Sequence, residues 1–173
     1  SVTSTGANHV VGLDAALGLF RSLDVNAYYA RSWTPGRSGD QSSYQARMAY
    51  NGDRYGITIN RIAVGPAFNP EIGFLARPAD YVRNFVNARF SPRPKRLRGV
   101  RKLSWEGSLE NFVSSAGVPQ TRLFNGTFRI IENSGDEFNV SRVQTEDRPL
   151  LPFRVAGAPI AAPPAISSAG VVV

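Results

Sequence analysis

The feature that most constrains this chain is an alternation of apolar and polar residues with a period of two, which recurs along most of its length. Successive side chains of a β-strand point to opposite faces of a sheet, so each such run predicts a strand with one apolar face. No stretch shows helical periodicity over about three turns. The predicted fold class is therefore all-β, an antiparallel up-and-down meander of about eight strands. We expect the strands at residues 9–20, 23–33, 43–50, 55–64, 82–90, 101–110, 122–131 and 138–143.

The lengths of the strands and connections favour part of a transmembrane β-barrel. Strands of soluble sheets usually have about five or six residues, whereas a tilted membrane-spanning strand needs about nine to eleven. The connections alternate between short ones, at 21–22 and 51–53, and long ones, at 34–42 and 65–80, as in outer-membrane barrels. The short connection at Asn51-Gly52 is a strong hairpin signal. Aromatic residues suited to interfacial girdles stand near the strand ends: Phe20, Trp33, Tyr50, Tyr55, Tyr81 and Phe90.

The other face of the predicted strands carries many charged and amide side chains. Such groups are costly in a dry core, but they suit a wet lumen or a solvated sheet face. The inward arginines, Arg47, Arg83, Arg89 and Arg129, are candidates to line an anion-selective path, because charge rings tune pore selectivity. The alternative is that they neutralise inward Asp and Glu. A soluble one-sided sheet gives the same alternation, so the sequence leaves both environments open.

Composition excludes several kinds of site. The formal charge of +7 comes almost wholly from arginine, which favours bidentate contacts to carboxylate or phosphate. Without cysteine there is no disulfide or thiolate metal site, and the single histidine, His9, leaves one candidate for a Ser-His-Asp arrangement. We expect no cofactor and no metal. No apolar run is long enough for a membrane helix, which leaves β spans open. The chain begins at Ser1 without a signal-peptide core, so we expect a mature or excised piece.

The connection at 65–80 holds the main candidate site. A loop of about sixteen residues is long for a compact β protein, and such loops are usually functional or disordered. Its apolar content argues against disorder. We expect it to fold onto the inside of a barrel as a plug or ligand contact, the alternative being a loop that packs for stability only. The candidate residues are Phe68, Asn69, Glu71, Phe74 and Arg77.

The segment Phe68-Asn-Pro-Glu-Ile-Gly-Phe-Leu-Ala-Arg77 resembles the signature of a bacterial β-barrel family of unassigned function. In that family the barrel follows a carbohydrate-binding family-9-like domain. The segment from Arg148 to Ile160 resembles a later part of the family pattern, so the resemblance runs from about Gly12 to Ile160. It implies export to a Gram-negative outer membrane and a glycan-related role. The carbohydrate-binding module is absent and family barrels are longer, so the resemblance implies a barrel fragment to which sugar binding is not transferred.

Three further candidates are weaker. The basic run from Arg93 to Lys102 could bind nucleic acid or lipid phosphates, and because it lies on the side of the short turns we favour a periplasmic or headgroup-facing loop. Glu106 and Glu110 share one face, about 13 Å apart by strand rise, beyond the spacing of a glycosidase pair. His9 stands near the terminus and is given no role.

The sequence thus predicts a β-barrel segment at 1–147 and a Pro- and Ala-rich tail at 148–173, which cannot form a central strand. The predicted function is passage or surface docking of a substrate, saccharide-related and non-catalytic, in the outer membrane of a Gram-negative bacterium. The expected partners are the lipid bilayer or lipopolysaccharide and a saccharide, with no nucleic acid. The alternative is a soluble β-sandwich or open barrel that binds glycans through exposed aromatics, Trp33, Tyr44 and Trp105.

Overall fold

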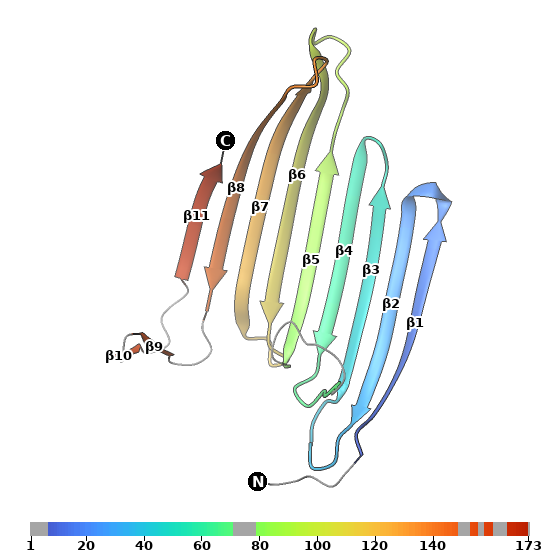
Figure 1. Cartoon of the computed structure of the whole chain (residues 1–173), viewed down its shortest axis with the longest axis vertical. Coiled ribbons are helices and arrows are strands. Elements are labelled where there is room, and N and C mark those ends of the chain that lie inside the picture. Colours follow the sequence, from blue (N-terminus) through green and yellow to red (C-terminus); the bar gives the residue numbers. More distant parts are fainter. Residues whose placement is uncertain (1–6, 71–78, 149–152, 156–157, 161–165, 173) are drawn as a thin grey trace.

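The computed structural model describes residues 7–70, 79–148, 153–155, 158–160 and 166–172. Nine strands form one antiparallel sheet in the order β1-β2-β3-β4-β5-β6-β7-β8-β11, which Figure 1 shows as a single layer. Each strand from β1 to β8 pairs with its neighbour in sequence, as a meander requires. The strands are β1 (His9–Leu19), β2 (Leu23–Trp33), β3 (Ser42–Asn51), β4 (Tyr55–Val64), β5 (Tyr81–Phe90), β6 (Val100–Val113), β7 (Pro119–Glu132), β8 (Glu137–Asp147) and β11 (Ile166–Val172).

The predicted all-β meander is confirmed, and the eight predicted strands correspond to β1 through β8. The strands β6 and β7 each have 14 residues, several more than predicted. The added strand, β11, comes from the predicted tail and pairs with β8 at the sheet edge. The tail was predicted not to form a central strand, and an edge position agrees with that prediction. Two strands of 3 residues, β9 (Phe153–Val155) and β10 (Ala158–Ile160), form a separate pair.

The sheet does not close on itself. In the part of the chain that the structure describes, β1 and β11 are its two edges, and no second sheet lies over either face of it. A closed barrel wall therefore stays a proposal. The second layer that the sandwich alternative requires is not present among the described residues.

The connections between strands lie in two groups, one at each end of the sheet. One end, the short-turn end, holds the β1–β2 turn at Phe20–Ser22, the β3–β4 turn and the β7–β8 turn. The predicted hairpin at Asn51-Gly52 forms, with the amide of Gly52 donating to the carbonyl of Tyr55 at 2.9 Å. Its loop is three residues long, and Gly52 is not among the glycines with positive φ. The connections at 34–41 and 65–80 lie at the opposite end, whereas the connection between β5 and β6 at 91–99 lies at the short-turn end (Figure 1).

The only sizeable cluster of buried residues in the described chain sits at the end with the long connections. The loop after β4 starts with Gly65, whose amide donates to the carbonyl of Ser42 at 2.9 Å. A Cβ on Gly65 would lie 2.4 Å from the carbonyl oxygen of Asp40, so this close approach requires glycine. Most of the sheet keeps both faces at least partly open to solvent. The buried residues around this loop are Ser32, Ser43, Asn60, Ala63, Val64, Ala67 and Phe68.

Candidate functional site

One face of the sheet, the apolar face, presents large hydrophobic side chains that no other described part of the chain covers. Leu13 is 77% exposed and Leu109 is 46% exposed. Strand register places these side chains on one face, because directly opposed residues point the same way. Four leucines and one valine from four different strands lie on it: Leu13, Leu17, Leu23, Val86 and Leu109. One row of register partners crosses seven strands: Leu17, Val25, Met48, Ile59, Val86, Leu109 and Phe124.

The apolar band on this face runs obliquely to the strands. In β2 it extends from Leu23 to Tyr29, and in β7 it extends from Phe124 to Ile130. A row is a set of directly opposed residues of this face on neighbouring strands. Between β2 and β7, both ends of the apolar stretch shift by two such rows toward the short-turn end. That shift is about 13 Å along the strands over about 24 Å across them. The limit toward the long connections is stepped, because it lies level in β2 and β3 and again level, two rows away, from β4 to β7.

A polar border follows the band at the end with the long connections. It is formed by Arg61, Asn84, Asn111 and Arg122, which are register partners across β4 to β7. The guanidinium of Arg61 donates to the amide oxygen of Asn84 at 2.7 Å. At the other limit of the band an aromatic row crosses the same four strands. The apolar stretch is thus bounded on both sides by groups suited to a membrane–water interface.

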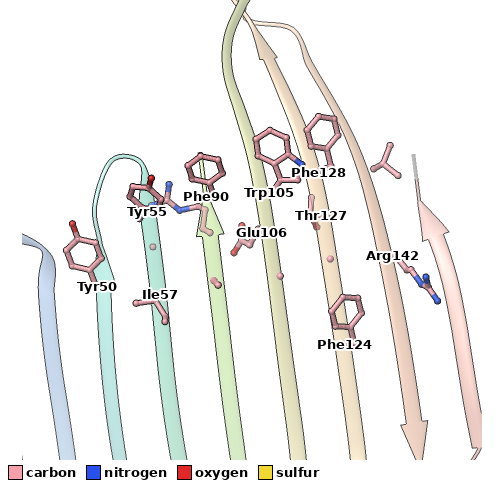
Figure 2. Close-up of a pocket in the computed structure, with 16 residues that line it drawn as sticks. Tyr50, Tyr55, Ile57, Phe90, Trp105, Glu106, Phe124, Thr127, Phe128 and Arg142 are labelled. Carbon is pink, nitrogen blue, oxygen red and sulfur yellow. The ribbon is translucent and has the colours of Figure 1, made fainter. Parts of the chain in front are cut away.

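The aromatic row lies near the short-turn end (Figure 2). The ring centroids of Tyr55 and Phe90 are 5.2 Å apart, those of Phe90 and Trp105 are 5.9 Å apart, and those of Trp105 and Phe128 are 5.2 Å apart. Beside the row, Gly107 and Gly126 are register partners and leave the backbone uncovered. The rings and the two glycines together frame an apolar groove of about 780 Å³. A Cβ on Gly107 would meet nothing within 4 Å.

The opposite face, the polar face, carries the four arginines predicted to line a lumen. Arg83 forms an ion pair with Glu110, and the two side chains are 26% and 19% exposed. The guanidinium of Arg83 also lies 5.3 Å from the ring centroid of Phe85. Arg129 lies 4.0 Å from a carboxylate oxygen of Glu137. These two arginines therefore neutralise acids of the same face.

Arg89 and Arg47 differ from that pair. Arg89 holds the β3–β4 turn, donating to the side chain of Asn51 at 2.8 Å, the carbonyl of Gly52 at 2.8 Å and the hydroxyl of Ser91 at 2.5 Å. Arg47 has no ion pair with any carboxylate of the described residues. Among the described residues, Arg47 is thus the one of the four predicted arginines that makes the fewest polar contacts with its own sheet.

Between the arginines runs a row of uncharged hydrogen-bonding groups. Thr58, Asn87, Ser108 and Asn125 are successive register partners across β4 to β7 on the polar face. Hydroxyl and amide side chains both donate and accept hydrogen bonds. Asn87 donates to Glu106 at 3.0 Å. Such a row matches the hydrogen-bonding pattern of a hydroxyl-rich solute or of ordered water.

The predicted plug loop packs onto the polar face at the end with the long connections. Phe68 is 6% exposed, and the amide of Asn69 donates to the hydroxyl of Ser32 at 3.0 Å. The carbonyl of Asn69 accepts from the side chain of Asn8 at 3.0 Å. The described start of the loop therefore anchors to the wall. The other three candidates, Glu71, Phe74 and Arg77, lie outside the described residues.

The remaining sequence candidates are dispersed. Glu106 and Glu110 make separate contacts with Asn87 and Arg83, and His9 is exposed opposite Trp33. The three aromatics of the glycan-binding alternative share the apolar face, but Trp33 ends β2 and Trp105 lies in the aromatic row near the opposite end. They do not form one platform. The sequence interpretation missed the groove, whose only sequence signal is the pair of glycines in two long alternating runs.

Among the described residues, no helix is long and apolar enough to cross a bilayer. The same residues contain no cluster of His, Cys, Asp or Glu able to hold a metal ion. No protein-family model, curated protein or solved structure matches the chain. The resemblance to the barrel family therefore stays a prediction.

Proposed function

We propose that this chain is a wall segment of a β-barrel in the outer membrane of a Gram-negative bacterium. Its apolar face contacts lipid, and its polar face lines an aqueous interior through which a substrate passes or on which it docks. The role is non-catalytic, and a saccharide is the substrate class that fits the polar face. The uncovered apolar face, set opposite a charged and hydrogen-bonding face, is the observation that carries this proposal.

The size of the uncovered surface supports a lipid environment. Monomeric soluble proteins rarely expose contiguous apolar patches larger than a few hundred Å², and larger patches mark protein or membrane contacts. Here the apolar row spans seven neighbouring strands, with four stacked or tilted rings near one end. The full strands have 10 to 14 residues, enough for a tilted membrane span.

The polar face supports an aqueous interior with mixed charge. Two of its four arginines, Arg83 and Arg129, pair with acids of the same wall, so it does not present the uniform ring of cations expected of an anion-selective pore. The row from Thr58 to Asn125 supplies neutral hydrogen-bonding groups between those ion pairs. A neutral, hydroxyl-rich solute therefore fits this wall better than a free anion. We therefore propose a saccharide as the substrate.

A cysteine scan of β6 tests the orientation of the two faces. The chain has no native cysteine, so single substitutions carry a nitroxide label at one defined site. In vesicles, labels at Leu103, Trp105, Gly107 and Leu109 are expected to be accessible to oxygen dissolved in the bilayer. Labels at Ser104, Glu106, Ser108 and Glu110 are expected to be accessible to a water-soluble nickel complex instead.

The period of the scan is the decisive result. A two-residue oscillation in oxygen accessibility, with its maximum on the odd positions, supports the proposed orientation. Uniform nickel accessibility at both sets of positions in the presence of vesicles would contradict it, because the sheet would then lie in water. Recovery of the chain as a monodisperse monomer in plain buffer would count against the membrane and for the soluble alternative.

A further inference from the structure

The apolar groove lies next to a strongly basic connection. Phe90, the last residue of β5, and Trp105 of β6 form part of the aromatic row that walls the groove. The chain leaves β5 at Phe90, passes through residues 91–99 and enters β6 at Val100. The segment from 91 to 105 contains no acidic residue. A cationic segment therefore stands directly beyond the aromatic end of an apolar groove.

Most cations of this segment form no ion pair with a described carboxylate. Arg93 pairs with Asp53 at 2.7 Å. Four exposed cations form no ion pair with any carboxylate of the described residues: Lys95, Arg96, Arg98 and Arg101. Leu97, in the middle of the run, is half exposed. The acids at the same end of the sheet include Asp53 in the β3–β4 turn, Asp136 in the β7–β8 turn, and Glu132 and Glu137 at the strand ends that flank that turn. The β7–β8 turn contacts the connection, since the amide of Asn133 donates to the carbonyl of Gly99 at 2.7 Å.

We propose that the groove and the basic connection form one binding site for an anionic glycerophospholipid, with an acyl chain on the glycine floor and the phosphate against the arginines. This inference rests on the proposed membrane location. The groove is an open apolar depression of about 780 Å³ on the face of the sheet, which gives an acyl chain a surface to lie on. Clusters of four or more cations beside a membrane segment bind anionic lipid headgroups, and arginine matches phosphate in a bidentate geometry.

The position of the site selects the lipid class. The aromatic row marks the headgroup level, because aromatic rings concentrate at the interface of a bilayer. In outer-membrane barrels the short turns face the periplasm. The site therefore opens to the periplasmic leaflet, where glycerophospholipid is the anionic lipid, and not to the outer surface. Gly107 and Gly126 keep the floor open, since any side chain at Gly107 would project into free space.

The two tryptophans provide the test. Trp105 lies in the groove wall, whereas Trp33 ends β2 at the opposite end of the sheet and serves as the internal control. The full chain carrying Trp33→Phe or Trp105→Phe is folded into vesicles that contain brominated phosphatidylglycerol or brominated phosphatidylcholine at equal mole fraction. Trp105 is expected to be quenched more strongly by the anionic lipid, and Trp33 equally by both. The preference at Trp105 is expected to fall as salt rises.

Two kinds of variant locate the site. Replacing Arg96 and Arg98 with Gln is expected to reduce the preference of Trp105 for the anionic lipid at least about fivefold, while the groove stays intact. Gly107→Leu fills the groove and is expected to lower quenching by both lipids at Trp105. Arg37→Gln, the same kind of charge removal at an exposed arginine of the connection between β2 and β3 at the opposite end of the sheet, is the matched control. Circular dichroism shows whether each variant is folded.

The outcomes separate this inference from the proposed function. Quenching of neither tryptophan by either lipid would overturn both, because the chain would not be in the bilayer. Equal quenching of Trp105 by the two lipids, with both tryptophans in contact with lipid, would overturn the inference and leave the membrane location standing. Displacement of the brominated lipid by lipid A but not by unlabelled phosphatidylglycerol would overturn the glycerophospholipid assignment.

Discussion

The sharpest prediction concerns two adjacent residues of β4 that point in opposite directions. Ile59 lies on the apolar face in the row with Met48 and Val86, one row inside the polar border at Arg61. Thr58 lies on the polar face beside Asn87. We expect Ile59→Arg to destabilise the folded chain strongly in a bilayer and Thr58→Arg to do so weakly. The two substitutions introduce the same side chain one residue apart in an interior strand, so strand propensity and position are nearly matched.

The magnitude follows from the depth of the two sites. An arginine on the lipid face of a barrel costs about 2–4 kcal/mol at the bilayer midplane and about 0–1 kcal/mol near the interface. Because Ile59 lies one row inside the polar border, Ile59→Arg is expected to cost about 2 kcal/mol, and Thr58→Arg, at a site that faces water in this arrangement, less than about 1 kcal/mol. Asn84→Arg, on the polar border of the same face, is expected to cost about 0–1 kcal/mol. In water the side chain of Ile59 is 42% exposed, and a substitution at such a surface usually stays within about 0.5 kcal/mol.

Urea unfolding of the chain in vesicles measures all three free energies. The expected order of destabilisation is Ile59→Arg well above Asn84→Arg and Thr58→Arg. The membrane orientation would be refuted if Ile59→Arg cost no more than Thr58→Arg in vesicles with reversible, two-state unfolding. A larger cost at Thr58 than at Ile59 would indicate the inverse arrangement, with the charged face against lipid.

Further predictions concern single contacts. Gly65→Ala is expected to destabilise the chain by about 1–3 kcal/mol, because its Cβ would collide with the backbone at 2.4 Å, whereas Gly107→Ala, which meets open space, is expected to change the urea midpoint little. Arg89→Ala is expected to loosen the β3–β4 turn, with faster amide exchange at residues 51–55, since three hydrogen bonds of 2.5–2.8 Å are lost; Arg47→Ala, with no such bonds, is the control and is expected to leave that exchange unchanged. Glu110→Gln is expected to cost about 1–2 kcal/mol in urea unfolding because its arginine partner keeps a charge in a partly desolvated site; an unchanged midpoint would show that this pair is solvated.

Strand positions follow from the sequence because a period-two pattern is a local property. The run from Leu23 to Trp33 was predicted with the bounds that β2 has in the structure. The strands β6 and β7 extend further than predicted because the alternation weakens at their ends, where polar Asn111 and Arg122 fall on the apolar face. The edge strand β11 was not predicted because Ala, Gly and Ser in its sequence give no clear pattern.

Contacts between strands required the structure. The sequence places Arg83 and Glu110 on one face. Their ion pair forms because the register of β5 and β6 makes these two residues diagonal neighbours. The groove depends on Gly107 lying opposite Gly126, which a shift of one residue in register would abolish. The same applies to the oblique band, which appears only when the apolar limits of separate strands are aligned. Local patterns thus predict faces, whereas sites arise from the alignment of strands.

The meander order has a consequence for how the sheet assembles. From β1 to β8 each strand pairs with the strand immediately before or after it in the chain, so each new strand adds to a template already in place. Contacts between sequence neighbours speed folding because little chain entropy is lost before they form. Such a sheet can grow by one strand at a time from either side. In the described sheet, only β11 pairs with a strand that does not precede it directly in the chain, since β9 and β10 lie between β8 and β11.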